Sequence, residues 1–320
     1  MSQQLNLIFC GTPQFAVPSL ERLIKTGFIV PLVVTQPDRP SGRGMELTAS
    51  PVKQCALGLG LNVTQPDKIK NNEEFRAQLA SLKPDAIIVV GYGRIIPQWM
   101  LDLPPMGNIN VHASLLPKYR GAAPIQWAIA SGESETGVTT MRIDAGLDTG
   151  DILLKRELPI ASQDTAVTLA VPLAAIGADL LVETLRRLQA GTIKSQPQDH
   201  SKATLAPILK KDDGKIDFKR TAQEITNRLR GFQPWPGAFT TFRGKNLQIG
   251  EVVAATSYVP SGQLSIKGNH LFIGCGAGTS LEIVHLQPEG KKRMLAQDFI
   301  HGYRPQPGEK LGNREPGTND

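Results

Sequence analysis

The chain has 320 residues, of which 40% are hydrophobic and 20% charged, so it is long enough for two domains with substantial cores. The net charge of +6 arises in the last third, because residues 1–200 hold 18 Lys+Arg and 18 Asp+Glu whereas residues 201–320 hold 17 and 11. Residues 201–320 are therefore the candidate contact for a polyanion.

Several classes of protein are disfavoured by the sequence. The cysteines and histidines are scattered, without the C-x-x-C or H-E-x-x-H spacings of redox and metal sites, so we predict no metal. No stretch approaches the roughly 18 apolar residues of a membrane span, and no cationic segment leads into a long apolar run near residue 1. We therefore expect a cytoplasmic protein.

Alternating strands and helices are predicted for about the first 190 residues. Thr12 is expected to cap a helix beginning at Pro13, Ser50 to cap one beginning at Pro51, and residues 73–82 to be helical. Apolar runs predict strands at 5–10, 30–35, 86–90 and 109–112. Such alternation predicts a doubly wound, Rossmann-like, mostly parallel sheet that binds ligands at the carboxyl ends of its strands.

A change of pattern follows this first region. A long helix is expected over 165–190, interrupted by Pro172 and ended by Gly191. Periodicity is then lost, which predicts a linker at 192–209 between a domain of residues 1–191 and a domain of residues 210–320. In the second domain, a helix at 221–232 precedes five short apolar runs, at 237–242, 247–253, 264–267, 270–273 and 281–286. Five short strands at this spacing predict a small β-barrel.

An amide and an imidazole lie two residues apart in the predicted strand at 109–112. Side chains at i and i+2 share one face of a strand, so Asn110 and His112 are expected to point into the same space. Such a pair can stabilise a developing oxyanion and pass a proton near neutral pH. Asn-x-His in an apolar strand is nevertheless more often a structural pair. Three carboxylates downstream, Asp144, Asp148 and Asp151, are alternatives for a third polar group.

A set of motifs, taken together, resembles the formyltransferase family that uses 10-formyltetrahydrofolate. The likeness extends over nearly the whole chain, through FCGTPQFA at 9–16, QPDRP at 36–40, GRG at 42–44, residues 108–117, RGAAPIQ at 120–126, GVTTM at 137–141, residues 144–152, PWPGA at 234–238 and GYRP at 302–305. The resemblance implies that Asn110, His112 and Asp148 are catalytic. Asp148 is preferred because the family's aspartate follows a leucine and stands two residues before a glycine; a turn aspartate that caps its own backbone is the alternative.

The resemblance also implies the co-substrate, the partner and their contacts. 10-Formyltetrahydrofolate would donate the formyl group, the amine of methionine on initiator methionyl-tRNA would accept it, and the C-terminal barrel would be OB-like. We expect the protein to be a monomer. Folate contacts are implied at Gly91, Tyr92, Gly93, Arg94, Ile95, Ser114, Leu115, Leu116 and Pro117, although 91–95 equally fits a glycine-rich turn. The candidates for tRNA contacts are Arg39 and Arg43 of a loop expected to be mobile, and Lys210, Lys211, Lys245, Lys291, Lys292 and Arg293.

Three alternatives remain open at this point. Relatives with the same catalytic core formylate glycinamide ribonucleotide or amino sugars, although a small substrate needs no basic barrel. A hydrolase of formyltetrahydrofolate would keep the same three catalytic residues. A non-catalytic tRNA-binding protein would keep the barrel while leaving Asn110, His112 and Asp148 free to vary.

Overall fold

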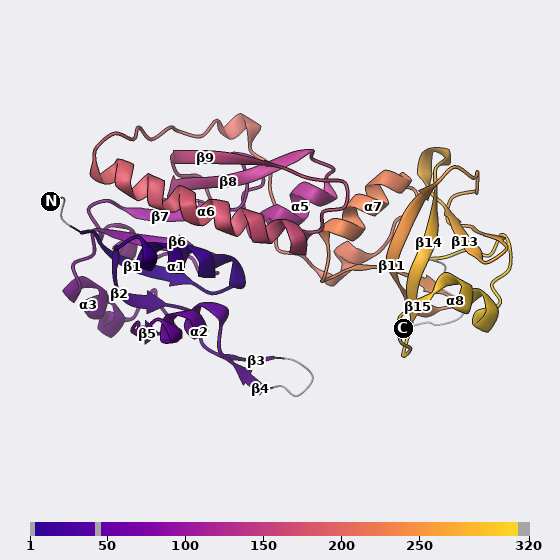
Figure 1. Cartoon of the computed structure of the whole chain (residues 1–320), viewed down its shortest axis with the longest axis horizontal. Coiled ribbons are helices and arrows are strands. Elements are labelled where there is room, and N and C mark those ends of the chain that lie inside the picture. The colour runs from indigo at the N-terminus through magenta and orange to yellow at the C-terminus, as the bar shows by residue number, and fades with distance from the viewer. Residues whose placement is uncertain (1–3, 42–45, 313–320) are drawn as a thin grey trace. The chain divides into compact units, whose positions relative to one another are not determined.

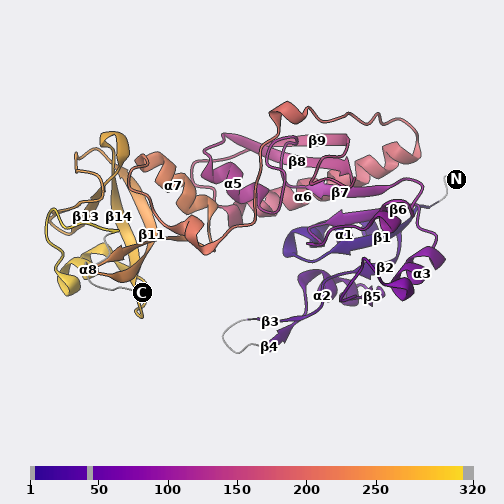
Figure 2. The same ribbon diagram turned by 180° about the vertical axis from the view of Figure 1, so that it is seen from behind.

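The protein is described by a computed structural model for residues 4–41 and 46–312 (Figures 1 and 2). The chain divides into two compact units. The first contains Met1–Pro124, Glu135–Ile160 and Thr168–Pro207, and the second contains Ile125–Ser134, Ala161–Val167 and Ile208–Asp320. The units interleave along the chain, and the boundaries expected at 191 and 210 stay a prediction.

The first unit is built on a seven-stranded sheet with the order β5-β2-β1-β6-β7-β8-β9. Neighbours from β5 to β7 pair in parallel, whereas β7 with β8 and β8 with β9 pair antiparallel. The predicted Rossmann-like, mostly parallel sheet is therefore confirmed, with an antiparallel edge in addition. Its strands are β1 (Asn6–Gly11), β2 (Ile29–Val34), β5 (Val63–Thr64), β6 (Ala86–Val90), β7 (Asn108–His112), β8 (Glu135–Arg142) and β9 (Ile152–Pro159), and a separate ribbon pairs β3 (Arg39–Ser41) with β4 (Glu46–Thr48).

The helices of the first unit begin partly as predicted. The Ser50 hydroxyl accepts a hydrogen bond from the Lys53 backbone N–H at 3.1 Å, which confirms this residue as the cap of α2 (Pro51–Gly58). The cap predicted at Thr12 is wrong, because its hydroxyl donates to the Tyr92 carbonyl instead. A 3-10 turn, η1 (Gln14–Ala16), precedes α1 (Val17–Lys25). The other short helices described in this unit are α3 (Glu73–Ser81) and α4 (Gln98–Leu101).

Helix α6 (Ala166–Gln189) runs through Pro172, so the interruption predicted there is wrong. It is also long and apolar enough to cross a membrane by length and composition, with a mean hydropathy of 1.8, contrary to the expectation that no such stretch exists. Half of that apolar window is buried, as in a core helix. Gly177 permits close packing on the sheet, since a Cβ there would lie 2.9 Å from a methyl carbon of Val111 in β7.

The second unit contains an antiparallel sheet that confirms the five predicted strands. Their order is β10-β11-β14-β13-β12, and a short β15 pairs with β14. Within the described residues, β10 and β12 form the two ends of this path. The strands are β10 (Ala238–Phe242), β11 (Lys245–Ala255), β12 (Leu264–Lys267), β13 (His270–Gly274), β14 (Ser280–Pro288) and β15 (Met294–Leu295), accompanied by α5 (Pro124–Ala130), α7 (Ala222–Gly231) and α8 (Ala296–Tyr303). Apolar side chains of α7, α8 and the sheet, among them Ile225, Leu247 and Phe299, form its core.

Candidate active site

Three segments that are distant in sequence meet at the carboxyl ends of β6 and β7. The two strands are parallel with Val89 opposite Asn110, so the loop that begins at Gly91 leaves the sheet beside His112. Strand β8 runs antiparallel to β7, with Thr139 opposite His112 and Arg142 opposite Ile109, so its last residue lies beside the start of β7. The segment that follows brings the Asp148 carboxylate back to Asn110 and His112. This is the edge at which a doubly wound sheet binds its ligands.

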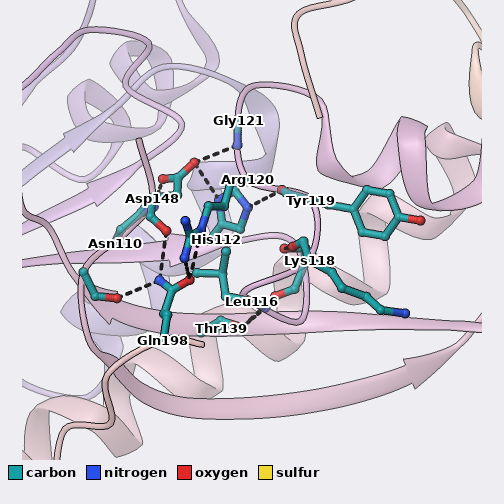
Figure 3. Close-up of polar contacts among 12 residues, drawn as sticks. Asn110, His112, Leu116, Lys118, Tyr119, Arg120, Gly121, Thr139, Asp148 and Gln198 are labelled. Carbon is teal, nitrogen blue, oxygen red and sulfur yellow. Dashed lines mark hydrogen bonds and ion pairs between the residues drawn. The ribbon is translucent and has the colours of Figure 1, made fainter. Parts of the chain in front are cut away.

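Asn110, His112 and Asp148 lie together there (Figure 3). The Asn110 amide nitrogen is 3.4 Å from Oδ1 of Asp148, and Nδ1 of His112 is 3.7 Å from Oδ2 of Asp148. Among the described residues, the side chains of Asp144 and Asp151 form no hydrogen bond or ion pair with Asn110 or His112. The Asp144 carboxylate accepts hydrogen bonds from Gly146 and Thr149 of its own turn, whereas Asp151 accepts the Arg142 N–H through its backbone carbonyl.

The tautomer of His112 follows from its second contact. Nε2 lies 2.9 Å from the carbonyl oxygen of Tyr119, and His112 is 6% exposed. Because a carbonyl oxygen can only accept, Nε2 carries a hydrogen. In the neutral ring Nδ1 then holds the lone pair, so this atom, facing Asp148, is the one that gains and loses a proton.

Asp148 is held from several sides by groups that the sequence did not reveal. Its backbone is left-handed with φ 51°, a conformation that non-glycine residues rarely adopt. The Gly121 N–H donates to its carboxylate at 2.8 Å, and the buried Gln198 side chain donates to its carbonyl at 2.8 Å. Gln198 belongs to the predicted linker, where no local pattern signals a site, whereas Arg120 and Gly121 lie in a segment that carries the family resemblance.

Few of the side chains in the loop at 91–95 are accessible to a ligand. The Tyr92 side chain is buried, and burial raises the pKa of its hydroxyl. The carbonyl of Tyr92 accepts hydrogen bonds from Thr12 and Gln36, and the Arg94 guanidinium donates to the Asp67 carbonyl. Ile95 is 90% exposed, and the glycines at 91 and 93 have φ values of 56° and 76°. The accessible surface is therefore one apolar side chain beside a glycine-rich backbone.

The segment at 114–117 is similarly divided between structural and accessible side chains. Ser114 is buried and its hydroxyl donates to the Lys118 carbonyl, while Leu116 packs with Met141 and Ile152. The side chains of Ser114 and Leu116 therefore support the fold, and those of Leu115 and Pro117 are the half-buried ones.

The predicted tRNA-binding residues that the structure describes are all exposed. The Glu289 N–H donates to the Asn246 carbonyl, and the Asn246 N–H donates to the Glu289 carboxylate. These contacts bring the turn before Lys245 and the turn containing Lys291 and Lys292 to one end of the sheet. Arg293 lines a cleft of about 270 Å³ with Gln233 and Gln287. Lys210 and Lys211 lie in another turn at η3 (Lys211–Gly214), Arg39 begins β3, and Arg43 lies outside the described residues.

Residues 5–185 match the family described as formyl transferase, and residues 208–304 match its C-terminal domain. The methionyl-tRNA formyltransferase of Koribacter versatilis is 68% identical over 306 residues, which cover 96% of this chain and 98% of that protein. The chain belongs to the methionyl-tRNA formyltransferase family. The enzyme of the same name from Acidobacterium capsulatum is 59% identical, covering 96% of this chain and all of that one.

Solved structures with the formyltransferase fold agree with the architecture. A sugar 3N-formyl transferase, solved with dTDP and 5-N-formyl-THF, has a TM-score of 0.63 at 21% identity, covering 91% of this chain and 100% of that one. HypX from Aquifex aeolicus, solved with tetrahydrofolic acid, has a TM-score of 0.59 at 16% identity, and the match covers 96% of this chain and 49% of that one. At these identities the likeness is one of fold.

Proposed function

We propose that this member of the methionyl-tRNA formyltransferase family transfers a formyl group from 10-formyltetrahydrofolate to the free amine of methionine on initiator methionyl-tRNA. It would act in the cytoplasm as a monomer. The observation that carries the proposal is the convergence of Asn110, His112 and Asp148 at the ligand-binding edge of the sheet. Near-complete coverage by relatives with this name supports the choice of acceptor.

The surface beside these residues fits a folate. A pterin is flat, with apolar faces and hydrogen-bonding edges, and the exposed Ile95 together with the open backbone at Gly91 and Gly93 suits both. Two proteins of the same fold were solved with folates, which supports a folate as the co-substrate. The co-substrate would supply the formyl carbon.

Each of the three polar side chains has a role that its contacts support. Formyl transfer to an amine places negative charge on the formyl oxygen, and Asn110 has a second amide N–H to donate beyond the one facing Asp148. Nδ1 of His112 would take the proton that the attacking amine loses as the tetrahedral intermediate forms. A proton delivered to N10 of the folate would then let the bond between N10 and the formyl carbon break, so that tetrahydrofolate leaves. Asp148 would stabilise the resulting imidazolium at 3.7 Å and share in proton transfer.

The exposed cations of the second unit are proposed as phosphate contacts. Lys245, Lys291 and Lys292 lie at one end of the sheet, and Arg293 adds a guanidinium beside the cleft. Lys210, Lys211, Arg39 and Arg43 are further proposed contacts for tRNA.

The experiment is transfer of labelled formyl from 10-formyltetrahydrofolate to methionine charged on initiator tRNA. Elongator methionyl-tRNA, glycinamide ribonucleotide and an amino sugar serve as competing acceptors. Preferential labelling of the initiator supports the proposal. Labelling of a small amine alone would keep the catalytic site and reject the acceptor, and release of formate without any acceptor would indicate a hydrolase.

A further inference from the structure

The buried Gln198 side chain binds the backbone of Asp148, and the buried Arg120 side chain binds Gln198. Gln198 lies 50 residues away from Asp148 in the sequence, in the segment that follows α6, and is 6% exposed. Its amide nitrogen donates to the Asp148 carbonyl at 2.8 Å and to the Gly150 carbonyl at 2.7 Å. One amide group therefore ties the backbone on both sides of Thr149.

Arg120 fixes the orientation of that amide. Its Nε and Nη2 atoms lie 3.1 and 2.6 Å from Oε1 of Gln198 (Figure 3). Because a guanidinium only donates, the amide oxygen must face Arg120, and the amide nitrogen must face the two carbonyls. Nη2 of Arg120 also lies 3.2 Å from Nδ1 of His200. The buried Arg120 guanidinium therefore holds the neutral amide of Gln198 in one orientation.

The residues on either side of Arg120 contact the proposed catalytic groups directly. The carbonyl of Tyr119 accepts from His112, and the N–H of Gly121 donates to the Asp148 carboxylate. The backbone of Arg120 is itself paired with Thr204 and Ala206, at 2.9 and 2.7 Å. Three consecutive residues thus set the positions of both His112 and Asp148.

We propose that Gln198, oriented by Arg120, is a positioning residue that holds Asp148 in its left-handed conformation and thereby aims the carboxylate at Nδ1 of His112. The conformation is intrinsically unfavourable, so it persists only where surrounding contacts determine it. Displacing a reacting group by about 1 Å can cost on the order of a hundredfold in rate. This inference rests on the proposed function.

Two variants separate positioning from packing. Gln198→Glu keeps the shape and still accepts from Arg120, but it presents an oxygen instead of a donor to the carbonyls of Asp148 and Gly150. Gln198→Met removes the hydrogen bonds without adding charge. We expect kcat to fall by about 10- to 100-fold in both, with little change in KM for either substrate and with a folded circular dichroism spectrum. Gln196→Glu, the same change at an exposed position two residues earlier, should retain the wild-type kcat.

A double-mutant cycle tests whether the effect passes through Asp148. If Gln198 acts by placing that carboxylate, Gln198→Met should cost less than about twofold further in an Asp148→Asn background. A wild-type kcat in both Gln198 variants, or the same loss with and without the Asp148 carboxylate, would overturn the inference. If the wild-type chain itself transfers no formyl group, it is the proposed function that fails.

Discussion

Nε2 of His112 donates to the Tyr119 carbonyl at 2.9 Å, and this single contact assigns the proton chemistry of the site. The backbone acceptor occupies one ring nitrogen and leaves the other, Nδ1, beside Asp148. Among the residues that the structure describes, Nδ1 is therefore the ring nitrogen without a backbone partner, and the Asp148 carboxylate lies 3.7 Å from it. In the proposed mechanism, Asn110 supplies the hydrogen-bond donor for the formyl oxygen, and His112 transfers the proton.

Removing the Asn110 amide should cost more in rate than in stability. Loss of one oxyanion donor typically costs about 3–4 kcal/mol of transition-state stabilisation, so Asn110→Ala should lower kcat several hundredfold. The side chain is only half-buried, so the circular dichroism spectrum and thermal midpoint should stay close to wild type. Steady-state formyl transfer checks the prediction, and a near wild-type rate would refute the role of the amide.

Gly121 cannot carry a side chain without moving the groups around it. Its φ is 120°, and a Cβ would lie 2.6 Å from the Ala206 carbonyl oxygen. Gly121→Ala should therefore destabilise the protein by roughly 1–3 kcal/mol and lower kcat, because its N–H holds the Asp148 carboxylate. Gly58→Ala is the matched control, since nothing lies within 4 Å of a Cβ there. Equal behaviour of the two variants in denaturant unfolding and formyl transfer would contradict the prediction.

The cations at the end of the second sheet should act on tRNA alone. Replacing Lys245, Lys291 and Lys292 with Gln should raise KM for methionyl-tRNA and flatten its dependence on salt by roughly one unit of log–log slope per lost phosphate contact. KM for the folate should not change. The control replaces Lys25, Lys68 and Lys70, which are exposed on the first unit. The assignment fails if both triple variants respond alike.

An ion pair in the second unit gives a pH-dependent test of stability. Arg243 contacts Glu309 through two hydrogen bonds, at 2.7 and 3.0 Å, and these lower the pKa of the Glu309 carboxyl from its ordinary 4.5. A lowered pKa contributes stability that is present above the ordinary value and lost as the pH falls below it. Arg243→Gln should therefore be less stable than wild type near neutral pH, and the difference should shrink under acid. Calorimetry near neutral pH and at a pH below 4.5 checks this prediction. The same difference in stability between the variant and the wild type at both pH values would count against the ion pair.

Sequence predicted the parallel part of the first sheet better than its antiparallel edge. Residues 86–90 form a continuous apolar run because β6 is buried throughout, and prediction and structure agree residue for residue there. Strand β8 contains buried threonines, and the Thr140 hydroxyl is 2.7 Å from that of Thr184 in α6. Such polar residues are satisfied only by long-range contacts, so hydropathy does not reveal the strand.

The candidate site likewise contains residues that the sequence predicts and residues that it does not. Asn110 and His112 could be paired from strand spacing alone, whereas choosing Asp148 from three nearby carboxylates needed the family resemblance. Gln198 could not be found from the sequence, because the partners of its side chain in the proposed site lie 48 to 78 residues away and its own segment has no periodicity. Local patterns predict which side chains share a face, but not which distant segment closes over them.

The most direct test of the central claim is single-turnover formyl transfer by Asp148→Asn with saturating folate and initiator methionyl-tRNA. The variant keeps the shape of the side chain and removes its charge. General acid–base participation is worth about 10²- to 10⁴-fold, so we expect a rate reduction in that range with the dissociation constants of both substrates nearly unchanged. A single-turnover rate equal to that of the wild type would show that Asp148 takes no part in the reaction and would contradict this account of the site.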